Sequence, residues 1–358
     1  MAIALSHGGT TIYAAPAPAS EVLVGTTEGV VTIARTGAGW EVAHRALADR
    51  HISAIVEEPT SGLLFAGAFH GGIHASADGG RTWERRTHGL RESNVYSVAA
   101  CQRDGRPVLY AGTEPAHLFR SDDLGESWAE LPSLRSVPSV PQWTFPAPPH
   151  VAHVKHIVFD PRDSRTMYAS VEVGGLLKSF DGGASWQELP VPYEDVHRLV
   201  IVPQTPDVLY VAAGNGLYVS PDGGATWERR TDREHELGGY PDFWLYRPSD
   251  PSLMFVSAAH QSPGSWRQSH FAGARISRSR DGGHTWEVLG GGLPDRLQAS
   301  VEAMCLQESA AGCALFAATT AGEVWHSADA GDHWARIVTG LAPVSKGGHY
   351  RPLMAASA

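Results

Sequence analysis

The 358-residue chain has few lysines, few cysteines and no cluster of basic residues, and the last two of these features each exclude a class of protein. Its 28 basic residues include only three lysines, Lys155, Lys178 and Lys346, and the formal net charge is -10. Because nucleic-acid backbones bind clustered positive charge, we expect no nucleic-acid partner. Three cysteines are too few and odd in number for a disulfide framework, which favours a reducing compartment.

The sequence also lacks long apolar runs and the pattern of a secretory leader. No run is long enough to span a bilayer. The first 20 residues, MAIALSHGGTTIYAAPAPAS, carry no basic stretch ahead of an apolar core. We therefore expect a cytoplasmic protein without a membrane partner. Amphipathic helical periodicity is nearly absent, whereas 39 glycines and 24 prolines are typical of short strands joined by turns.

What the chain does contain is one octapeptide, repeated. The six copies are 76–83 (SADGGRTW), 121–128 (SDDLGESW), 179–186 (SFDGGASW), 220–227 (SPDGGATW), 279–286 (SRDGGHTW) and 327–334 (SADAGDHW), and an eroded copy (RTGAGW) covers 35–40. Their tryptophans, from Trp40 to Trp334, are spaced at the length of a four-stranded blade. The repeats predict an all-β fold, a seven-bladed β-propeller of four-stranded antiparallel blades that forms one domain over 1–358.

Each copy is suited to a tight hairpin between the third and fourth strands of a blade. The Asp carboxylate accepts backbone N–H groups, and the glycines take conformations that a Cβ would penalise. This pattern resembles the Asp-box or BNR-repeat β-propellers, which include sialidases, xyloglucan-cleaving enzymes, sortilin-type domains and the photosystem assembly factor. The resemblance implies that the Asp boxes lie away from any active site and are structural. The alternative reading of their carboxylates is calcium binding or acid/base chemistry.

The N-terminal part supplies only three strands for the first blade. We therefore assign its innermost strand to HYRPL, which begins at His349. On this interpretation the C-terminal strand closes the ring, and its first three residues line the channel.

Aligning the inner strands (HISAI, NVYSV, VKHIV, DVHRL, PDFWL and SVEAM) places one column of side chains on the channel. That column is Ser53, Tyr96, His156, His197, Phe243, Glu302 and Arg351. The turns between second and third strands should open at the same mouth and add Glu114 and Glu172. Carboxylates beside imidazoles can supply general acid and base groups. The predicted catalytic residues are His156, His197, Glu114, Glu172 and Glu302.

Other side chains are candidates for substrate binding at this mouth. Arg198 and Arg351 suit an anionic group, because a guanidinium fits a carboxylate. Two insertions, 131–150 and 258–274, should rise over the same face and wall a ligand. The remaining candidates are Tyr350, His70, His117, His260 and Trp266. The alternatives are that the loops only cap the channel and that its polar groups only hold ordered water.

The 18 histidines raise a second possibility. His51, His156, His197 and His349 lie on inner strands of different blades and could together hold a divalent transition metal. The arrangement is similar in concept to the four-histidine iron site of carotenoid-cleavage propellers, whose sequence motifs are absent here.

These observations favour a hydrolase or lyase that acts on a small or carbohydrate-like ligand by Glu/His acid–base chemistry. The chain departs from the sialidase pattern, because it has no Arg-Ile-Pro type segment near its start, so classical sialidase activity is not expected. Xyloglucan-cleaving enzymes cleave between two tandem propellers, whereas this chain provides one. Two alternatives stay open: a histidine-ligated metal enzyme, and a non-catalytic scaffold with a protein partner.

Overall fold

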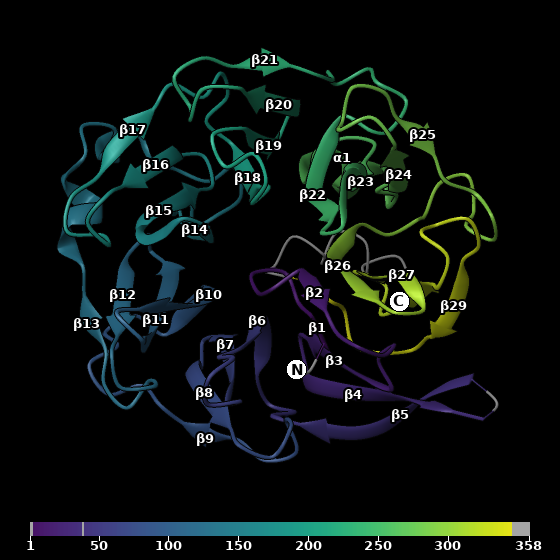
Figure 1. Cartoon of the computed structure of the whole chain (residues 1–358), viewed down its shortest axis with the longest axis horizontal. Coiled ribbons are helices and arrows are strands. Elements are labelled where there is room, and N and C mark those ends of the chain that lie inside the picture. Colours follow the sequence, from purple (N-terminus) through teal and green to yellow (C-terminus); the bar gives the residue numbers. More distant parts are fainter. Residues whose placement is uncertain (1–2, 38, 346–358) are drawn as a thin grey trace.

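The computed structural model, which describes residues 3–37 and 39–345, is a ring of seven sheets around a central axis (Figure 1). Blade one contains β1 (Ile3–Leu5), β3 (Glu21–Thr26), β4 (Gly29–Thr36) and β5 (Gly39–Ala46). Blade two contains β6 (His51–Glu57), β7 (Leu64–Phe69), β8 (Gly72–Ser76) and β9 (Glu84–Arg85). Blade three contains β10 (Asn94–Arg103), β11 (Arg106–Glu114), β12 (Leu118–Ser121) and β13 (Ala129–Glu130).

Blades four and five contain β14 (Val154–Asp160), β15 (Asp163–Val171), β16 (Gly175–Ser179) and β17 (Gln187–Leu189), then β18 (Val196–Ile201), β19 (Leu209–Ala213), β20 (Gly216–Ser220) and β21 (Glu228–Arg229). Blades six and seven contain β22 (Tyr240–Arg247), β23 (Asp250–Ala259), β24 (Arg275–Ser279) and β25 (Glu287–Val288), then β26 (Val301–Ser309), β27 (Gly312–Thr319), β28 (Val324–Ser327) and β29 (Ala335–Val338). The prediction of a seven-bladed β-propeller is confirmed.

The hydrophobic core lies between neighbouring blades. One buried cluster joins Phe255 and Ile276 of blade six to Met304 and Leu315 of blade seven, and equivalent clusters fill the other interfaces. A strand with a blade on each side is buried on both faces, which explains a continuous apolar segment such as LFAGAF in β7. The outermost strands, such as β9, are exposed.

The ring is closed by the N-terminal segment, and this corrects one prediction. β1 pairs in parallel with β3 as the innermost strand of blade one. β2 (Ile12–Ala14) then pairs in parallel with β26 of blade seven, with Ile12 opposite Leu306. Figure 1 shows both strands close to the axis. The position that we assigned to 349–353 is therefore held by Ile3–Leu5, while 349–353 lies outside the described residues. Repeat alignment missed β1 because it precedes the first repeat.

The Asp boxes form the predicted hairpins at the ends of the blades opposite to the starts of the inner strands. In the box of blade five, Asp222 Oδ1 accepts the backbone N–H of Thr226 at 2.8 Å and Oδ2 accepts the Thr226 hydroxyl at 2.6 Å. The buried Ser220 hydroxyl accepts the N–H of Gly224. The Asp and Ser side chains of the box therefore accept the hydrogen bonds of backbone N–H groups within the same turn.

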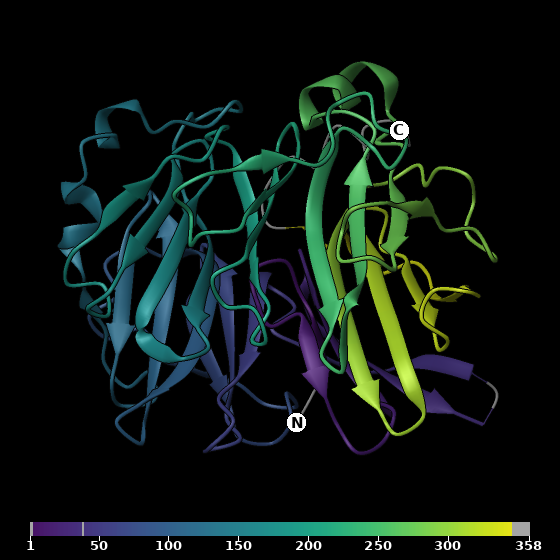
Figure 2. The ribbon, with the colours of Figure 1, turned by 45° about the horizontal axis from the view of Figure 1, so that its top comes forward.

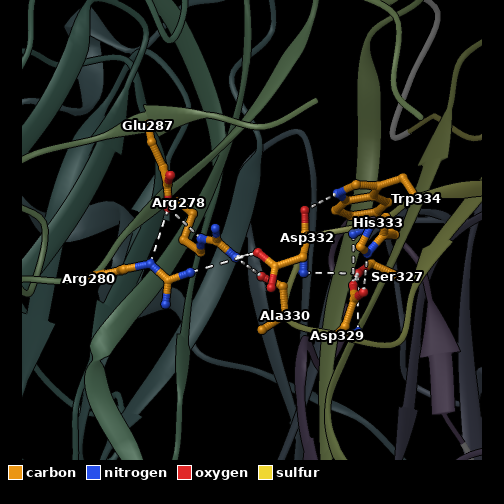
Figure 3. Close-up of polar contacts among 10 residues, drawn as sticks. Arg278, Arg280, Glu287, Ser327, Asp329, Ala330, Asp332, His333 and Trp334 are labelled. Atoms are coloured by element: carbon orange, nitrogen blue, oxygen red, sulfur yellow. Dashed lines mark hydrogen bonds and ion pairs between the residues drawn. The ribbon is translucent and has the colours of Figure 1, made fainter. Parts of the chain in front are cut away.

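The boxes also tie neighbouring blades together. Figure 3 shows Arg278 of β24 reaching the next blade, where it donates to the Ala330 carbonyl at 2.7 Å and to Asp332 at 2.7 Å. Arg86 donates in the same way to the carbonyl of Leu124. Leu124 and Ala330 replace the first glycine of their boxes and keep its positive φ, 58° and 56°. In both boxes an arginine therefore donates to the carbonyl of the residue whose positive φ is unfavourable for a side chain with a Cβ.

The Asp boxes predict a loss of stability in acid. Hydrogen bonds from Thr226 lower the pKa of Asp222 to about 2, and turn bonds likewise lower the pKa of Asp78, Asp123, Asp181, Asp281 and Asp329. Because these values lie below the unfolded value of 3.8, the stabilisation is present above that value and is lost as pH falls towards 2.

Thermal melts between pH 6 and pH 2 should therefore show a falling melting temperature over this window. The variant Asp222→Ala should melt lower at pH 6 and depend less on pH, since it has one such carboxylate fewer. A pH dependence identical to that of the parent would contradict the role assigned to the box.

The two insertions lie on one side of the ring. The first contains the short 3-10 helices η1 (Pro132–Ser136) and η2 (Val140–Gln142), and the second contains α1 (Pro263–Ser269). Figure 2 shows both at the top of the ring. No helix within the described ranges is long and apolar enough to cross a membrane.

Candidate functional site

The site lies at the mouth, which we define as the end of the axis where the inner strands begin. The pairing of Asn94 with Glu114 and of His51 with Phe69 puts the turns between second and third strands at this same end. The Asp boxes lie at the other end. The sequence-based placement of turns and boxes on opposite ends is therefore correct.

A β-bulge recurs at one position in six inner strands. Each time the strand advances by two residues while its partner advances by one, so one residue is left outside the ladder. The bulged residues are Ser53, Tyr96, Lys155, His197, Asp242 and Glu302, and all are buried. The bulge therefore places a polar side chain from each of these blades near the axis.

Lys155 links blade four to blade six through carboxylates. Its Nζ lies 2.9 Å from Asp242 Oδ1 of blade six and 3.2 Å from Glu172 Oε1 of its own blade. The side chain is 1 % exposed, and charges that far from water need close partners of opposite sign. His197 of the intervening blade lies 3.7 Å from Asp242.

His153, which precedes β14, lies between two carboxylates. Its Nε2 is 2.6 Å from Glu172 Oε2, and its Nδ1 is 3.7 Å from Glu114 Oε2. The ring stacks on Tyr96 with centroids 3.8 Å apart, and Phe145 of the first insertion contacts it edge-on at 5.1 Å. The insertion thus packs directly against the site, and aromatic rings fix the orientation of the imidazole.

His197 is oriented by a backbone carbonyl. Its Nδ1 lies 2.6 Å from the carbonyl oxygen of Pro241, and its Nε2 lies 3.2 Å from Asp195 Oδ1 and 3.9 Å from Glu172 Oε1. The ring is fully buried beside Tyr240. His197 therefore faces two carboxylates with one nitrogen while the backbone holds the other.

The N-terminal segment also reaches the site, through His7, Gly8 and Gly9. His7 Nδ1 contacts the Glu302 backbone carbonyl at 2.9 Å and its carboxylate at 3.5 Å. Gly8 and Gly9 pass so close to blades two and three that a Cβ would lie 2.1 Å from the Tyr96 carbonyl and 2.2 Å from that of Ile55. Only glycine fits this approach.

Burial and neighbouring charge raise the pKa of three groups at the mouth. Burial, and then the charge of Glu172, raise the pKa of Glu114 above its ordinary value. Burial also raises the pKa of Tyr96 and Tyr240, so both phenols stay protonated. Glu114 is thus the carboxyl group at the mouth whose protonated form the fold favours, and Lys155 faces the neighbouring carboxylate of Glu172.

His156 and Arg198 lie apart from these groups. The Arg198 guanidinium contacts His156 Nε2 at 3.2 Å, donates to the His7 carbonyl at 2.7 Å and packs over Phe243. Burial lowers the pKa of Arg198 to about 10 and also lowers that of His156. Both residues line a cavity of about 260 Å³ that lies along the second half of the inner strands.

The structure brings together only part of the predicted catalytic set. Glu114, Glu172 and His197 lie in the mouth, Glu302 lies beneath them with His7, and His156 lies on the cavity side. The alignment is the reason: in blades four and six the bulged residue is the second residue of VKHIV and PDFWL and not the third, so Lys155 and Asp242 take the places given to His156 and Phe243.

The predicted binding residues are dispersed. His70 and His260 are exposed, and His117 is held by Glu130 and Arg135. Trp266, at 1 % exposure, packs on Tyr240 in a small core cluster. Tyr350 and Arg351 lie outside the described residues. Because Trp266 and Arg198 are buried, they pack behind the site and are not exposed to a ligand that enters from solvent.

Three of the four histidines predicted to hold a metal, His51, His156 and His197, form no metal-binding group with one another within the described residues. His51 Nε2 contacts the Ser345 carbonyl, His156 contacts Arg198, and His349 lies outside the described residues. Within 3–37 and 39–345, the groups with metal-binding spacing are His7, Asp242 and Glu302, and Glu172, Asp195 and His197. Of the predicted histidines that the structure describes, only His197 belongs to either group.

The alignment of repeats missed His7, His153, Lys155, Asp195 and Asp242 as site residues. His7 lies before the first repeat, and His153 precedes its strand. Lys155 and Asp242 interrupt otherwise apolar second positions in VKHIV and PDFWL. That interruption was the available signal, and a bulge is the backbone feature that explains it.

The fold and the mouth define a seven-bladed β-propeller with a buried cluster of carboxylates, histidines and one lysine at its axis. No family model matches the chain. A xyloglucanase of Paenibacillus sp is 25 % identical over 243 residues, which cover 59 % of this chain and 22 % of that protein. The xyloglucanase Xgh74A of Acetivibrio thermocellus is 26 % identical over 262 residues, 63 % of this chain and 30 % of that protein. The chain spans less than a third of the length of these relatives.

Solved structures show the same fold. The GH74 xyloglucanase from Xanthomonas campestris superposes with a TM-score of 0.68 at 19 % identity, covering 95 % of this chain and 56 % of that one. YCF48 bound to D1 peptide gives a TM-score of 0.54 at 16 % identity, covering 92 % and 87 %. A xyloglucanase and a protein bound to a peptide thus share this architecture, so the function has to be inferred from the site.

Proposed function

We propose that the chain is a hydrolase of carbohydrate-like substrates whose acid–base pair is Glu114 and Glu172 at the mouth. The observation that carries this proposal is that one imidazole, His153, contacts both carboxylates, while their surroundings differ. Neighbouring carboxyl groups whose environments separate their pKa values are typical of acid/base pairs.

The two groups take different roles. Glu114 keeps its proton more readily than an ordinary glutamate, and it is the general acid that protonates the leaving oxygen of a glycosidic bond. Glu172 is held beside Lys155 and His153, and it is the ionised partner that activates water or attacks carbon. Glu114, at 8 % exposure, is also more accessible than Glu172 at 1 %. A general acid needs this access, because it has to contact the leaving oxygen of the substrate.

The relatives support the class of substrate. Two curated proteins named xyloglucanase are similar to more than half of this chain. Because the chain covers only a small part of these proteins, xyloglucan is one substrate to test and is not assigned as the natural substrate.

Glu114→Gln should lower kcat/KM by roughly 10²- to 10⁴-fold on an unactivated glycoside. It should do so far less on an aryl glycoside whose leaving group needs no proton. Since Glu114 works protonated, activity in the parent should fall as pH rises through its raised pKa, and this alkaline limb should vanish in the variant. The measurement is a pH–rate profile on xyloglucan oligosaccharides and matched aryl glycosides.

Glu130→Gln is the matched control, because Glu130 also pairs with a histidine, His117, but outside the mouth. Equal activities of Glu114→Gln and the parent on both substrates would refute the assignment. Absence of hydrolysis of every glycan tested by the folded parent would favour the scaffold alternative.

A further inference from the structure

We propose that His197, Asp195 and Glu172 form a binding site for a divalent transition-metal cation at the mouth. This site differs from the four-histidine set predicted from the sequence, and it shares Glu172 with the proposed acid–base pair. It rests on the orientation of one buried imidazole and on the spacing of the atoms that it faces.

The Pro241 carbonyl settles which nitrogen of His197 carries a proton. A carbonyl oxygen only accepts hydrogen bonds, so at 2.6 Å the His197 Nδ1 must be the donor. In the neutral ring Nε2 then carries a lone pair. That atom is buried and has no hydrogen-bond partner, and it points towards the Asp195 and Glu172 oxygens. A lone pair facing carboxylates requires a cation or a proton between them.

The distances match a metal ion. Zinc bonds imidazole nitrogen and carboxylate oxygen at about 2.0–2.2 Å, so two ligands of a tetrahedral ion lie roughly 3.3 Å apart. Nε2 of His197 and Oδ1 of Asp195 are separated by 3.2 Å, and Oδ1 is likewise buried without a hydrogen-bond partner. Glu172 Oε1, at 3.9 Å from Nε2, needs a shift of about half an ångström to complete three ligands.

The supporting groups also fit. A ligating histidine almost always donates its second nitrogen to a carbonyl or carboxylate, as His197 does. Asp195 keeps 13 % of its side chain exposed, which gives an ion a path from solvent. A Cβ on Gly214 would lie 2.1 Å from Asp195 Oδ2, so a glycine at this position lets the carboxylate take its place.

The ligand types select the kind of ion. One imidazole with two carboxylates suits Zn²⁺, Co²⁺ or Mn²⁺, whereas Ca²⁺ and Mg²⁺ prefer oxygen alone. Lys155, which contacts Glu172 Oε1 at 3.2 Å, opposes a second positive charge. The affinity should therefore be moderate, and weaker than that of closed structural zinc sites.

The test is a titration of the EDTA-treated full-length protein with Co²⁺, followed by calorimetry and by visible absorption. The parent should bind one equivalent with ligand-field bands of a nitrogen–oxygen site, and Zn²⁺ should displace it. Asp195→Asn and Gly214→Ala should each weaken Co²⁺ binding at least tenfold. Gly214→Ala removes no ligand and only displaces the carboxylate. His117→Gln, which removes a histidine paired with a carboxylate elsewhere, should bind like the parent.

Absence of stoichiometric Co²⁺ binding by the folded parent overturns the site. Binding that both variants leave unchanged also overturns it, because the ion then belongs to other residues. Glycan hydrolysis by the EDTA-treated protein is a separate measurement. Its presence or absence bears on Glu114 and Glu172 as an acid–base pair and not on the metal.

Discussion

Removing residues 1–14 should leave a chain that does not form a stable ring. The deletion takes away β1, the innermost strand of blade one, and β2, which pairs with β26 of blade seven. It also exposes the edges of β3 and β26 and removes the backbone partners of Ser53 and Val98. We expect loss of the cooperative melt and soluble aggregates in size-exclusion chromatography. A synthetic peptide of residues 1–14 added during refolding should restore part of the melt.

Tyr13→Phe is the control for this deletion. It keeps both strands and removes only a hydroxyl that bonds the backbone of Ala4 and Thr10, so it should lower stability by about 1–3 kcal/mol. A truncated chain that melts like the parent would show that the N-terminal segment does not close the ring.

The second large effect is expected from Lys155→Met. The substitution removes the ammonium that faces Glu172 and Asp242 at a place where all three side chains are buried. Removing one partner from a buried ion pair costs about 3–5 kcal/mol, and urea unfolding of the parent and the variant measures it. Adding Glu172→Gln should cost less than the sum of the two single changes, because both act on the same pair.

Lys178→Met is a matched comparison on the same blade. Lys178 lies over the rings of Tyr168 and Phe180 and is half-buried, so its loss should cost about 1 kcal/mol or less. Equal losses for Lys155→Met and Lys178→Met would refute the central position given to Lys155.

The sequence was informative where a feature repeats. Six Asp boxes and one eroded copy, with their tryptophans, specify seven blades, and the pairing of Asn94 with Glu114 confirms which end of that blade faces the mouth. The turn positions of Glu114 and Glu172 follow from the same repetition. A feature that occurs in every blade can be aligned against itself, so errors at single positions do not matter.

The site was less predictable because its geometry depends on features that occur once or shift the register. One bulged residue per inner strand puts Lys155, and not His156, beside Glu172. His7 reaches the mouth only because 6–11 crosses from blade one to blade seven, a path that no repeat encodes. Burial of Trp266, a residue of α1, likewise depends on how one insertion folds.

The pairing of β2 with β26 has a consequence for how the protein is made. Ile12 and Leu306, which lie opposite each other, are separated by nearly the whole described sequence. During synthesis β2 leaves the ribosome long before β26, its partner in blade seven, has been made. Blades two to six are therefore able to form while β2 is still unpaired. Contacts between such distant residues raise contact order and slow folding. We expect the closing step to come last and to limit the rate, and an unpaired N-terminal segment to be the aggregation-prone part of the nascent chain.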